Sequence, residues 1–446
     1  MSGRAEWAVL AVILAAYLAL AGLYAVRTPD WQAPDEPAHY NYVQQIADEG
    51  RLPVIAPGDW QQEYQEQLKA SRFAPELLGR LDTIQYEDHQ PPLYYLLLAP
   101  VYALSDGDLL ALRLTSALLG AGVVTAAWAA LRAAFPGRPV LALSGAGFVA
   151  FLPQHLSILA SVNNDALAEL VVALTLWAVV VYLRGMRPIH PATLGALAGV
   201  ALITKTTIYF VAGIVALTIL LRGRRERWPR RVAAAHLAAA ILPALLIGGA
   251  WWVRNLHVYG GTDFVGLERH DAVTVGQMRT DEYIEVVLGG EERQYLANLL
   301  RTTFHSFWGQ FGWMAVPLPG TVYRALGGIT LGVLAGAALF ARQQGWPRTL
   351  DGPERDTLLL FAVTIALVTV AFALYNLDFV QFQGRYLYPA LVPLAFVVGA
   401  GLCGWAGLIA GQRRVAQGLP LGAIAALALF AFYALETYLV PNLLAW

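Results

Sequence analysis

The sequence contains a single cysteine, Cys403, in a chain of 446 residues. One thiol has no partner within the chain, so intramolecular disulfides and metal sites built from several cysteines are excluded, and the redox compartment cannot be read. Charged residues are also scarce, at 14% of the chain. We find no internal repeat and no low-complexity linker. This composition excludes both an ordinary soluble domain and a disordered chain.

Hydrophobic residues make up 57% of the sequence, with 13 Trp and 20 Tyr. Many apolar runs approach the 20 or so residues that one helical crossing of a bilayer needs. We therefore predict an all-α polytopic membrane protein with a single transmembrane domain, residues 1–446, and about eleven spans. The predicted spans are 7–26, 109–131, 139–158, 166–183, 192–204, 206–221, 232–253, 322–341, 358–375, 386–409 and 419–440.

The positive charges are distributed unevenly between alternate loops. Of the 30 Lys and Arg residues, 16 fall in the loops on the side of the N-terminus, together with only 5 of the 31 acidic residues. Because Lys and Arg gather in cytoplasmic loops, we predict a cell-membrane protein with a cytoplasmic N-terminus. Two large extracytoplasmic loops then follow, 27–108 and 254–321. These are the first and fourth outer loops, and we expect interfacial helices in both.

Residues 192–221 provide only 30 residues for two predicted crossings. One helix would be simpler, but it would reverse the sidedness of every later loop, so the charge distribution favours two short helices. Their junction places Lys205 below the outer surface. A lysine at that depth is costly unless it meets an anion, although a side chain that extends to the headgroups is the alternative. Short or broken spans often mark binding sites.

Two adjacent carboxylates, Asp35 and Glu36, follow the first span. Pro37 and Gly50 predict the start and the end of a helix, so one carboxylate is expected to cap it. We assign the cap to Glu36, which directly precedes Pro37. Asp35 is then free for chemistry at the membrane boundary, and it is our first candidate for catalysis.

Other unusual polar residues fall on the same predicted side. Asp165 stands at the start of the fourth span, where it is either an N-cap or a site residue, and Glu169 lies one turn further along. Arg385 opens the tenth span. A cation there opposes the helix dipole unless it binds an anion, while an interfacial anchor is the alternative. Lys205, Arg254 and Arg385 are thus three cations at the outer ends of spans, on the same predicted side as Asp35 and Asp165.

Cations with a free carboxylate fit a departing lipid phosphate and a base that activates a nucleophile. Nucleotide sugars are absent outside the cytoplasm, so a sugar donor there must be carried on a polyprenyl phosphate. We predict that Asp35 takes the proton of an acceptor hydroxyl as it attacks the anomeric carbon. The cations would stabilise the departing phosphate. The acceptor is a lipid, a glycan or a protein in contact with membrane lipids, and nucleic acid is not an expected partner.

Several segments carry a resemblance to a known superfamily. They are the acidic pair Asp35-Glu36, the Pro-Pro-Leu-Tyr-Tyr run at 91–95, and Leu-Ile-Thr-Lys at 202–205. This order resembles the GT-C glycosyltransferases, of the protein O-mannosyltransferase and lipid A aminoarabinose transferase types. The Gln-Gly-Arg-Tyr segment at 383–386 and the Asn-Asn-Asp segment at 163–165 look more like bacterial multi-spanning proteins related to that superfamily.

The resemblance implies an outward-facing cavity, a polyprenyl-phosphate sugar donor and usually inversion at the sugar. The implied catalytic residues are Asp35, Glu36 and Asp165. The implied residues for the lipid phosphate and the donor are Lys205, Arg254, Arg385, His89 and Tyr94. No cofactor is required. Some GT-C members use a divalent metal, and Asp35, Asp165 and His39 could hold one here, but no ligand spacing demands it.

Two other functions share the same cations. A transporter or flippase of lipid-linked sugars would have the cavity without needing Asp35. A ligase or polymerase would use diphosphate-linked saccharides in place of monophosphate-linked ones. A purely structural membrane protein would not be expected to gather so many charges at one set of span ends.

Overall fold

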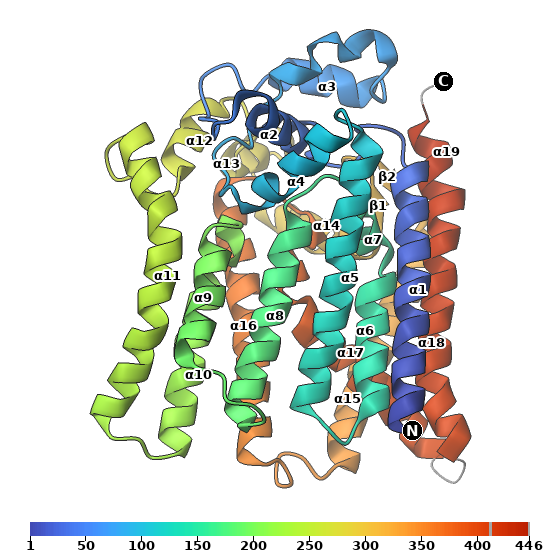
Figure 1. The fold of residues 1–446 in the computed structure, drawn as a ribbon. Coiled ribbons are helices and arrows are strands. Elements are labelled where there is room, and N and C mark those ends of the chain that lie inside the picture. Colours follow the sequence, from blue (N-terminus) through green and yellow to red (C-terminus); the bar gives the residue numbers. More distant parts are fainter. Residues whose placement is uncertain (410–412, 445–446) are drawn as a thin grey trace.

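The structure, a computed structural model, describes residues 1–409 and 413–444. The predicted domain limit at residue 446, and part of the loop before the last span, lie outside these described residues. Within them the chain is almost entirely helical, as predicted (Figure 1). The one sheet found there is a hairpin whose two strands have two residues each, with Gln310 paired to Pro317 and Phe311 to Val316.

Eleven helical regions correspond to the eleven predicted spans. They are α1 (Gly3–Arg27), α5 (Leu109–Ala134), α6 (Pro139–Phe151) with α7 (Pro153–Leu159), α8 (Asp165–Arg184), α9 (Pro191–Leu202), α10 (Phe210–Arg225), α11 (Arg230–Tyr259), α15 (Gly320–Gln343), α16 (Gly352–Asp378), α17 (Leu391–Ala406) and α18 (Arg413–Ala434). By length and composition, nine helices of the described chain can cross a membrane, or ten if the bent pair α6 and α7 is one span.

The remaining region is α9, which has 12 residues. At 1.5 Å per residue it is about 18 Å long, well short of a hydrocarbon core about 30 Å thick. It ends at Leu202, and Lys205 lies in the break that follows, directly before the short turn η2 (Thr206–Ile208) and α10. The interrupted pair predicted from the sequence is thus present, with its break at the predicted lysine.

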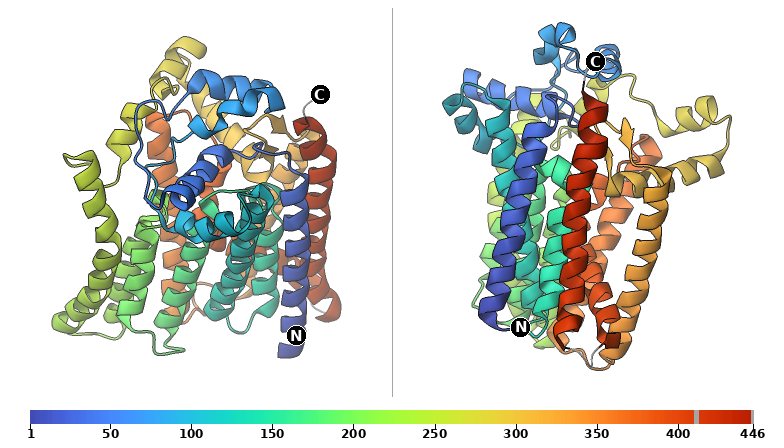
Figure 2. Two further views of the ribbon diagram at one scale, coloured as in Figure 1. Left: turned by 45° about the horizontal axis from the view of Figure 1, so that its top comes forward. Right: turned by 90° about the vertical axis from the view of Figure 1, so that its right-hand side faces the viewer.

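The helices and strands between spans gather at one end of the bundle, which we call the upper end after its position in Figure 1. They are α2 (Glu36–Glu49), α3 (Gln62–Ala70), η1 (Pro75–Thr83), α4 (Leu93–Leu104), α12 (Leu267–Val273), α13 (Thr280–Glu282), η3 (Tyr283–Val287), α14 (Glu292–Trp308), β1 (Gln310–Phe311), β2 (Val316–Pro317) and η4 (Gly384–Ala390). The remaining short segments are η5 (Gly407–Ile409), η6 (Leu435–Leu439) and α19 (Val440–Leu443). Figure 2 shows α2 and α4 lying across the end of the bundle.

The N-terminus lies at the opposite, lower end, together with the short connections after α5, α8, α10 and α15 (Figure 1). The long loops predicted to be extracytoplasmic therefore share one end of the molecule, and the Arg-rich loops share the other. The interfacial helices expected in the first and fourth outer loops are α2 to α4 and α12 to α14. The first of these begins and ends as the sequence predicts, with Gly50 at its C-cap in a left-handed conformation, φ 67°.

Pro153 explains the bend of 64° between α6 and α7. Proline has no N–H, so the carbonyl of Val149 loses its helical partner. The Nδ1–H of His155 donates to that carbonyl instead, at 2.7 Å. Its Nε2 then faces Glu169 at 2.6 Å in a fully buried pair. Glu169, which the sequence left without an explanation, thus has a histidine partner that the sequence did not identify.

The core of the bundle is α8. Of an apolar stretch of 18 residues in each helix, 83% is buried in α8, against 17% in α11 and in α15. Small residues allow the outer helices to approach closely. A Cβ on Gly195 of α9 would overlap the backbone of Ala240 on α11. This close packing is common between membrane helices. It fixes the short α9, and hence Lys205, against a full-length neighbour.

Candidate active site

A cavity of about 340 Å³ opens at the upper end of the bundle. Its polar lining comes from segments far apart in the sequence: Asp35, His39, Glu87, His89, Gln90, Asp165, Lys205, Thr206, Thr207, His270, Asp271 and Arg385. Its apolar wall is mostly α16 and η4, through Val368, Ala371, Phe372, Tyr375, Tyr386 and Pro389. A polar pocket with one apolar wall suits a ligand that has a charged head and a hydrocarbon tail.

Two cations and two carboxylates neutralise one another in this cavity. Lys205 Nζ lies 2.5 Å from Asp165 Oδ1. Arg385 donates from Nη2 to Asp35 Oδ2, and its Nη1 is 3.9 Å from Asp165 Oδ2. The Nε of Arg385 is buried without a hydrogen-bond partner among the described residues. A buried donor left unpaired is costly. It is therefore a vacant position for an acceptor atom, such as an oxygen of a bound anion.

Asp35 is held at the cavity by its backbone and by two neighbours. It occupies the N-cap position of α2 with a left-handed φ of 65°, and its side chain makes no capping hydrogen bond. The Tyr86 hydroxyl donates to Asp35 Oδ1 at 2.8 Å. Burial alone raises the pKa of Asp35, but the charge and hydrogen bond of Arg385 and the other neighbours offset this and lower it to about 2. The left-handed backbone of Asp35 is strained for a residue other than glycine, and strain of this kind is typical of functional sites.

The prediction that Glu36 caps α2 is wrong. Its carboxylate is fully buried and forms a two-pronged salt bridge with Arg113 of α5, through Nε at 2.8 Å and Nη2 at 2.6 Å. It also accepts the backbone N–H of Val162 at 3.1 Å. Arg113 further donates to the carbonyls of Ala25 and Thr28. Glu36 does not line the cavity, and this cluster instead ties α1, α2, α5 and the loop before α8 together beside Asp35.

Asp165 and Lys205 lie where the sequence analysis expected them. The backbone N–H of Asp165 is capped by Asn163 Oδ1 at 2.9 Å, so its own carboxylate is not a cap and remains available to the cavity. Lys205 follows the last turn of α9 and is half-buried. It reaches Asp165 and not the surface, so the alternative of a lysine extending to the headgroups is not what the structure shows.

Arg385 owes its position to the residue before it. Gly384 packs against α14, where its N–H donates to Ser306 Oγ at 2.7 Å. A Cβ at position 384 would overlap the backbone of Thr303 and Phe307. We expect Gly384→Ala to displace η4 and to lower activity and thermal stability together. The matched control is Gly327→Ala on α15, where nothing lies within 4 Å of an added Cβ. Equal stability of the two variants would contradict this explanation.

Two histidines of the cavity, His39 and His89, are neutral near pH 7. Burial lowers the pKa of His39 to about 3, against the opposing influence of Asp35. Burial, then the neighbouring His270, lowers the pKa of His89 well below its usual range. His89 Nδ1 donates to the Tyr86 carbonyl at 3.0 Å, and its ring lies 4.2 Å from that of His270. His89 therefore lines the cavity without contributing charge.

Glu87 is a cavity residue that the sequence analysis did not select. Burial, and then the charge of Asp35, raise its pKa to about 7. No hydrogen bond or ion pair involves its carboxylate in the described part of the chain. The only signal in the sequence was its place two residues before His89 in an acidic stretch of the first outer loop, which does not separate it from Asp88.

Two predicted donor-binding residues lie outside the cavity. Arg254 donates to the carbonyl of Pro53 and packs on the ring of Trp251, 4.8 Å from its centroid. The Tyr94 hydroxyl is buried between Ser116 Oγ, at 2.7 Å, and the backbone N–H of Asn163, at 2.9 Å. Both residues hold segments of the upper end together, and neither is placed to touch a ligand in this cavity.

The residues proposed for a divalent metal do not form a ligand group as they stand. No cluster of three or more His, Cys, Asp or Glu side chains in the described chain is arranged to hold a metal ion. Asp35 and Asp165 face cations, and Nδ1 of His39 faces the Tyr95 hydroxyl at 2.9 Å. Two nearby positive charges oppose a metal cation at this position.

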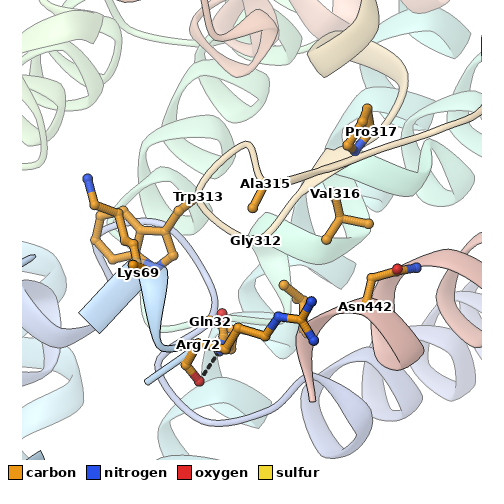
Figure 3. A pocket seen from close by; sticks show the side chains of 11 residues that line it. Gln32, Lys69, Arg72, Gly312, Trp313, Ala315, Val316, Pro317 and Asn442 are labelled. Atoms are coloured by element: carbon orange, nitrogen blue, oxygen red, sulfur yellow. Dashed lines mark hydrogen bonds between the residues drawn. The ribbon is translucent and has the colours of Figure 1, made fainter. Parts of the chain in front are cut away.

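Two further hollows lack this chemistry. A cleft of about 250 Å³ between the first outer loop, β2 and α19 is lined by Gln32, Lys69, Arg72, Trp313 and Asn442, among others, without a carboxylate (Figure 3). A larger apolar cavity, about 650 Å³, lies between α14, α15, α17 and α18 and has no ionisable side chain in its lining. The chemistry of the described upper end is therefore concentrated in the cavity that contains Asp35.

The family described as "Predicted membrane protein (DUF2142)" matches residues 80–394, which is more than half of the chain. This chain belongs to the DUF2142 family. No curated protein matches it. Among solved structures, this DUF2142 protein is similar to the oligosaccharyltransferase of Archaeoglobus fulgidus tethered with an acceptor peptide, with a TM-score of 0.55 and 14% identity over 99% of this chain and 55% of that one.

A second similar structure is ArnT from Cupriavidus metallidurans bound to undecaprenyl phosphate, with a TM-score of 0.49 and 13% identity over 99% of this chain and 74% of that one. The DUF2142 protein spans about half the length of the oligosaccharyltransferase. At this identity the likeness to the oligosaccharyltransferase shows the fold alone, which is that of the GT-C superfamily. The GT-C architecture expected from the sequence is therefore confirmed.

Proposed function

We propose that this protein is an integral-membrane glycosyltransferase that moves a sugar from a polyprenyl-phosphate donor to an acceptor hydroxyl. The observation that carries the proposal is the paired charge cluster of Asp35, Asp165, Lys205 and Arg385 beside the apolar wall of α16. A donor phosphate would bind the unpaired Nε–H of Arg385 and would replace Asp165 on Lys205. The polyprenyl chain would follow α16 toward the membrane. The GT-C fold supports this proposal.

In the proposed reaction the acceptor oxygen forms a bond to the anomeric carbon as the bond from that carbon to the phosphate oxygen breaks. The bonding pair stays on the phosphate, where Lys205 and the unpaired Nε–H of Arg385 would stabilise it. Attack from the face opposite the phosphate inverts the sugar. Asp35, which stays paired with Nη2 of Arg385, would accept a hydrogen bond from the acceptor hydroxyl and orient it.

We further propose that the upper end is extracytoplasmic, in the cell membrane, because the Arg-rich loops lie at the lower end. The acceptor would be a lipid, a glycan or a protein at that surface. The cleft of Figure 3 lies beside the loop that carries Asp35. One of the residues that line it, Gln32, is three residues before Asp35 in the sequence.

The decisive experiment uses the purified protein in lipid nanodiscs with a panel of polyprenyl-phosphate sugars and an acceptor-rich membrane extract. We expect release of polyprenyl phosphate and incorporation of labelled sugar with one donor. No release from any donor by folded protein would overturn the proposal. Release only from diphosphate-linked saccharides would indicate a ligase or polymerase.

Asp35→Asn is expected to lower the transfer rate at least about 100-fold, because a misplaced reactant typically loses that much. Donor binding should change little, since both cations remain. The measurement is single-turnover transfer with equilibrium binding of the donor. Undiminished movement of lipid-linked sugar across vesicles, without transfer by either protein, would favour a flippase instead.

A further inference from the structure

Glu87 and Asp35 are two carboxylates that line the same cavity in different states. Asp35 is paired with Arg385 and accepts the hydroxyl of Tyr86. The side chain of Glu87 has no hydrogen-bond or ion-pair partner in the described chain, yet it lines the cavity. A carboxylate that lines a cavity and has no partner is available to a ligand that binds in that cavity.

The surroundings push the protonation of the two groups apart. Burial and the charge of Asp35 raise the pKa of Glu87 to about 7. Burial also raises the pKa of Asp35, but the charge of Arg385 and the hydrogen bonds from Arg385 and Tyr86 outweigh it and lower that pKa to about 2. The charged and titratable groups that act on Glu87 from the neighbouring elements are Asp35, Lys205, His270 and Arg385, with Tyr86, Asp88, Tyr95, Tyr375 and Tyr386 nearby.

Glu87 and Asp35 can therefore have different roles, one as a general base and the other as a fixed negative charge. A general base is most effective when its pKa lies near the working pH, because it must both take up the proton and hold it. Two carboxylates with pKa values pushed apart by their environments are the usual sign of such an assignment. A carboxylate whose pKa is near 2 holds a proton poorly, but it keeps its negative charge throughout the reaction.

We propose that Glu87 is the group that accepts the proton of the acceptor hydroxyl, while Asp35 orients that hydroxyl and stabilises positive charge on the sugar ring. The inference rests on the proposed transferase function. As the acceptor oxygen bonds to the anomeric carbon and the phosphate leaves with its electron pair, the hydroxyl proton passes to the Glu87 carboxylate, which becomes a neutral acid. Glu87 thus takes the proton-transfer role that the sequence assigned to Asp35.

The first test is the pH dependence of transfer. A base must be deprotonated to act, so the wild-type kcat/KM should rise with pH and level off above about 7. Glu87→Gln should lower kcat about 10² to 10⁴-fold, the usual contribution of a general base, and should abolish this rise while leaving the donor KM within a few-fold. Glu87→Asp should recover part of the rate and the rise. Glu76→Gln, on an exposed residue of η1, is the matched control.

The second test does not depend on transfer. A hydrophobic carbodiimide modifies protonated carboxyl groups, and peptide mass spectrometry locates the product. We expect labelling of Glu87 at pH 6 that declines with a midpoint near pH 7, and none of Asp35 between pH 6 and pH 8. Glu87 that remains unlabelled at pH 6, but reacts at about pH 4 where ordinary carboxyl groups are also protonated, would overturn the proposed protonation.

The two tests separate the possible failures. If the wild type is active and Glu87→Gln keeps both its rate and its rise with pH, the assignment of Glu87 is wrong and the transferase function stands. If the wild type releases polyprenyl phosphate from no donor, the transferase function and the catalytic assignment fall together. The labelling result then still decides whether Glu87 holds a proton near neutral pH.

Discussion

Replacement of Arg385 by Gln is expected to lower the rate of transfer by about 10² to 10³-fold, the loss seen when one preorganised donor to a developing anion is removed. Arg385 is almost fully buried, with a relative exposure of 7%, so water cannot replace its charge on the phosphate. The loss should appear in kcat more than in the donor KM, because the charge on the departing oxygen grows in the transition state. Single-turnover release of polyprenyl phosphate measures it.

Arg254→Gln is the matched control, because it removes an arginine that the sequence also assigned to phosphate but whose guanidinium binds Pro53 and packs on Trp251. Its transfer rate should stay within about threefold of the wild type, a small change beside the loss expected for a transition-state donor. Equal losses in the two variants would contradict a specific role of Arg385 at the departing phosphate. Arg385→Lys should recover little, since an ammonium cannot reproduce the planar fork of donors.

The sequence was sufficient to bring Asp35, Asp165, Lys205 and Arg385 to one end of the molecule. The number of spans between them fixes the end at which each one emerges, and the distribution of arginines tests that number. The sequence could not show which of these carboxylates pairs with which cation. Whether Arg385 meets Asp35 or Asp165 depends on the tilt of η4 against α14, and so on the contact of Gly384.

The role of Glu36 was missed because its partner lies inside an apolar run. Arg113 is the fifth residue of α5, and the sequence analysis passed over it as part of a span. A charge within a span calls for a partner. That rule, applied to Arg113, would have reserved one of the two neighbouring carboxylates for it. For Glu87 no such rule exists, because a carboxylate left unpaired is recognised only after the partners of its neighbours are known.

Replacement of Glu36 by Gln is expected to destabilise the protein by about 3–5 kcal/mol, because it leaves the charge of Arg113 buried without its counter-ion. Arg113 is 2% exposed and Glu36 is fully buried. The amide keeps the shape of the side chain, so the loss reports charge and not a cavity. Thermal unfolding in detergent, followed with a thiol-reactive dye at the single Cys403, measures the change.

Two comparisons make this prediction specific. Glu49→Gln removes a partner of Arg51 in an exposed pair, which should change stability by no more than about 1 kcal/mol. The double variant Glu36→Gln with Arg113→Met should recover part of the loss, since the unpaired charge is gone. A Glu36→Gln protein as stable as the wild type would contradict the buried salt bridge. A stable but inactive one would instead return Glu36 to the catalytic role that the resemblance implied.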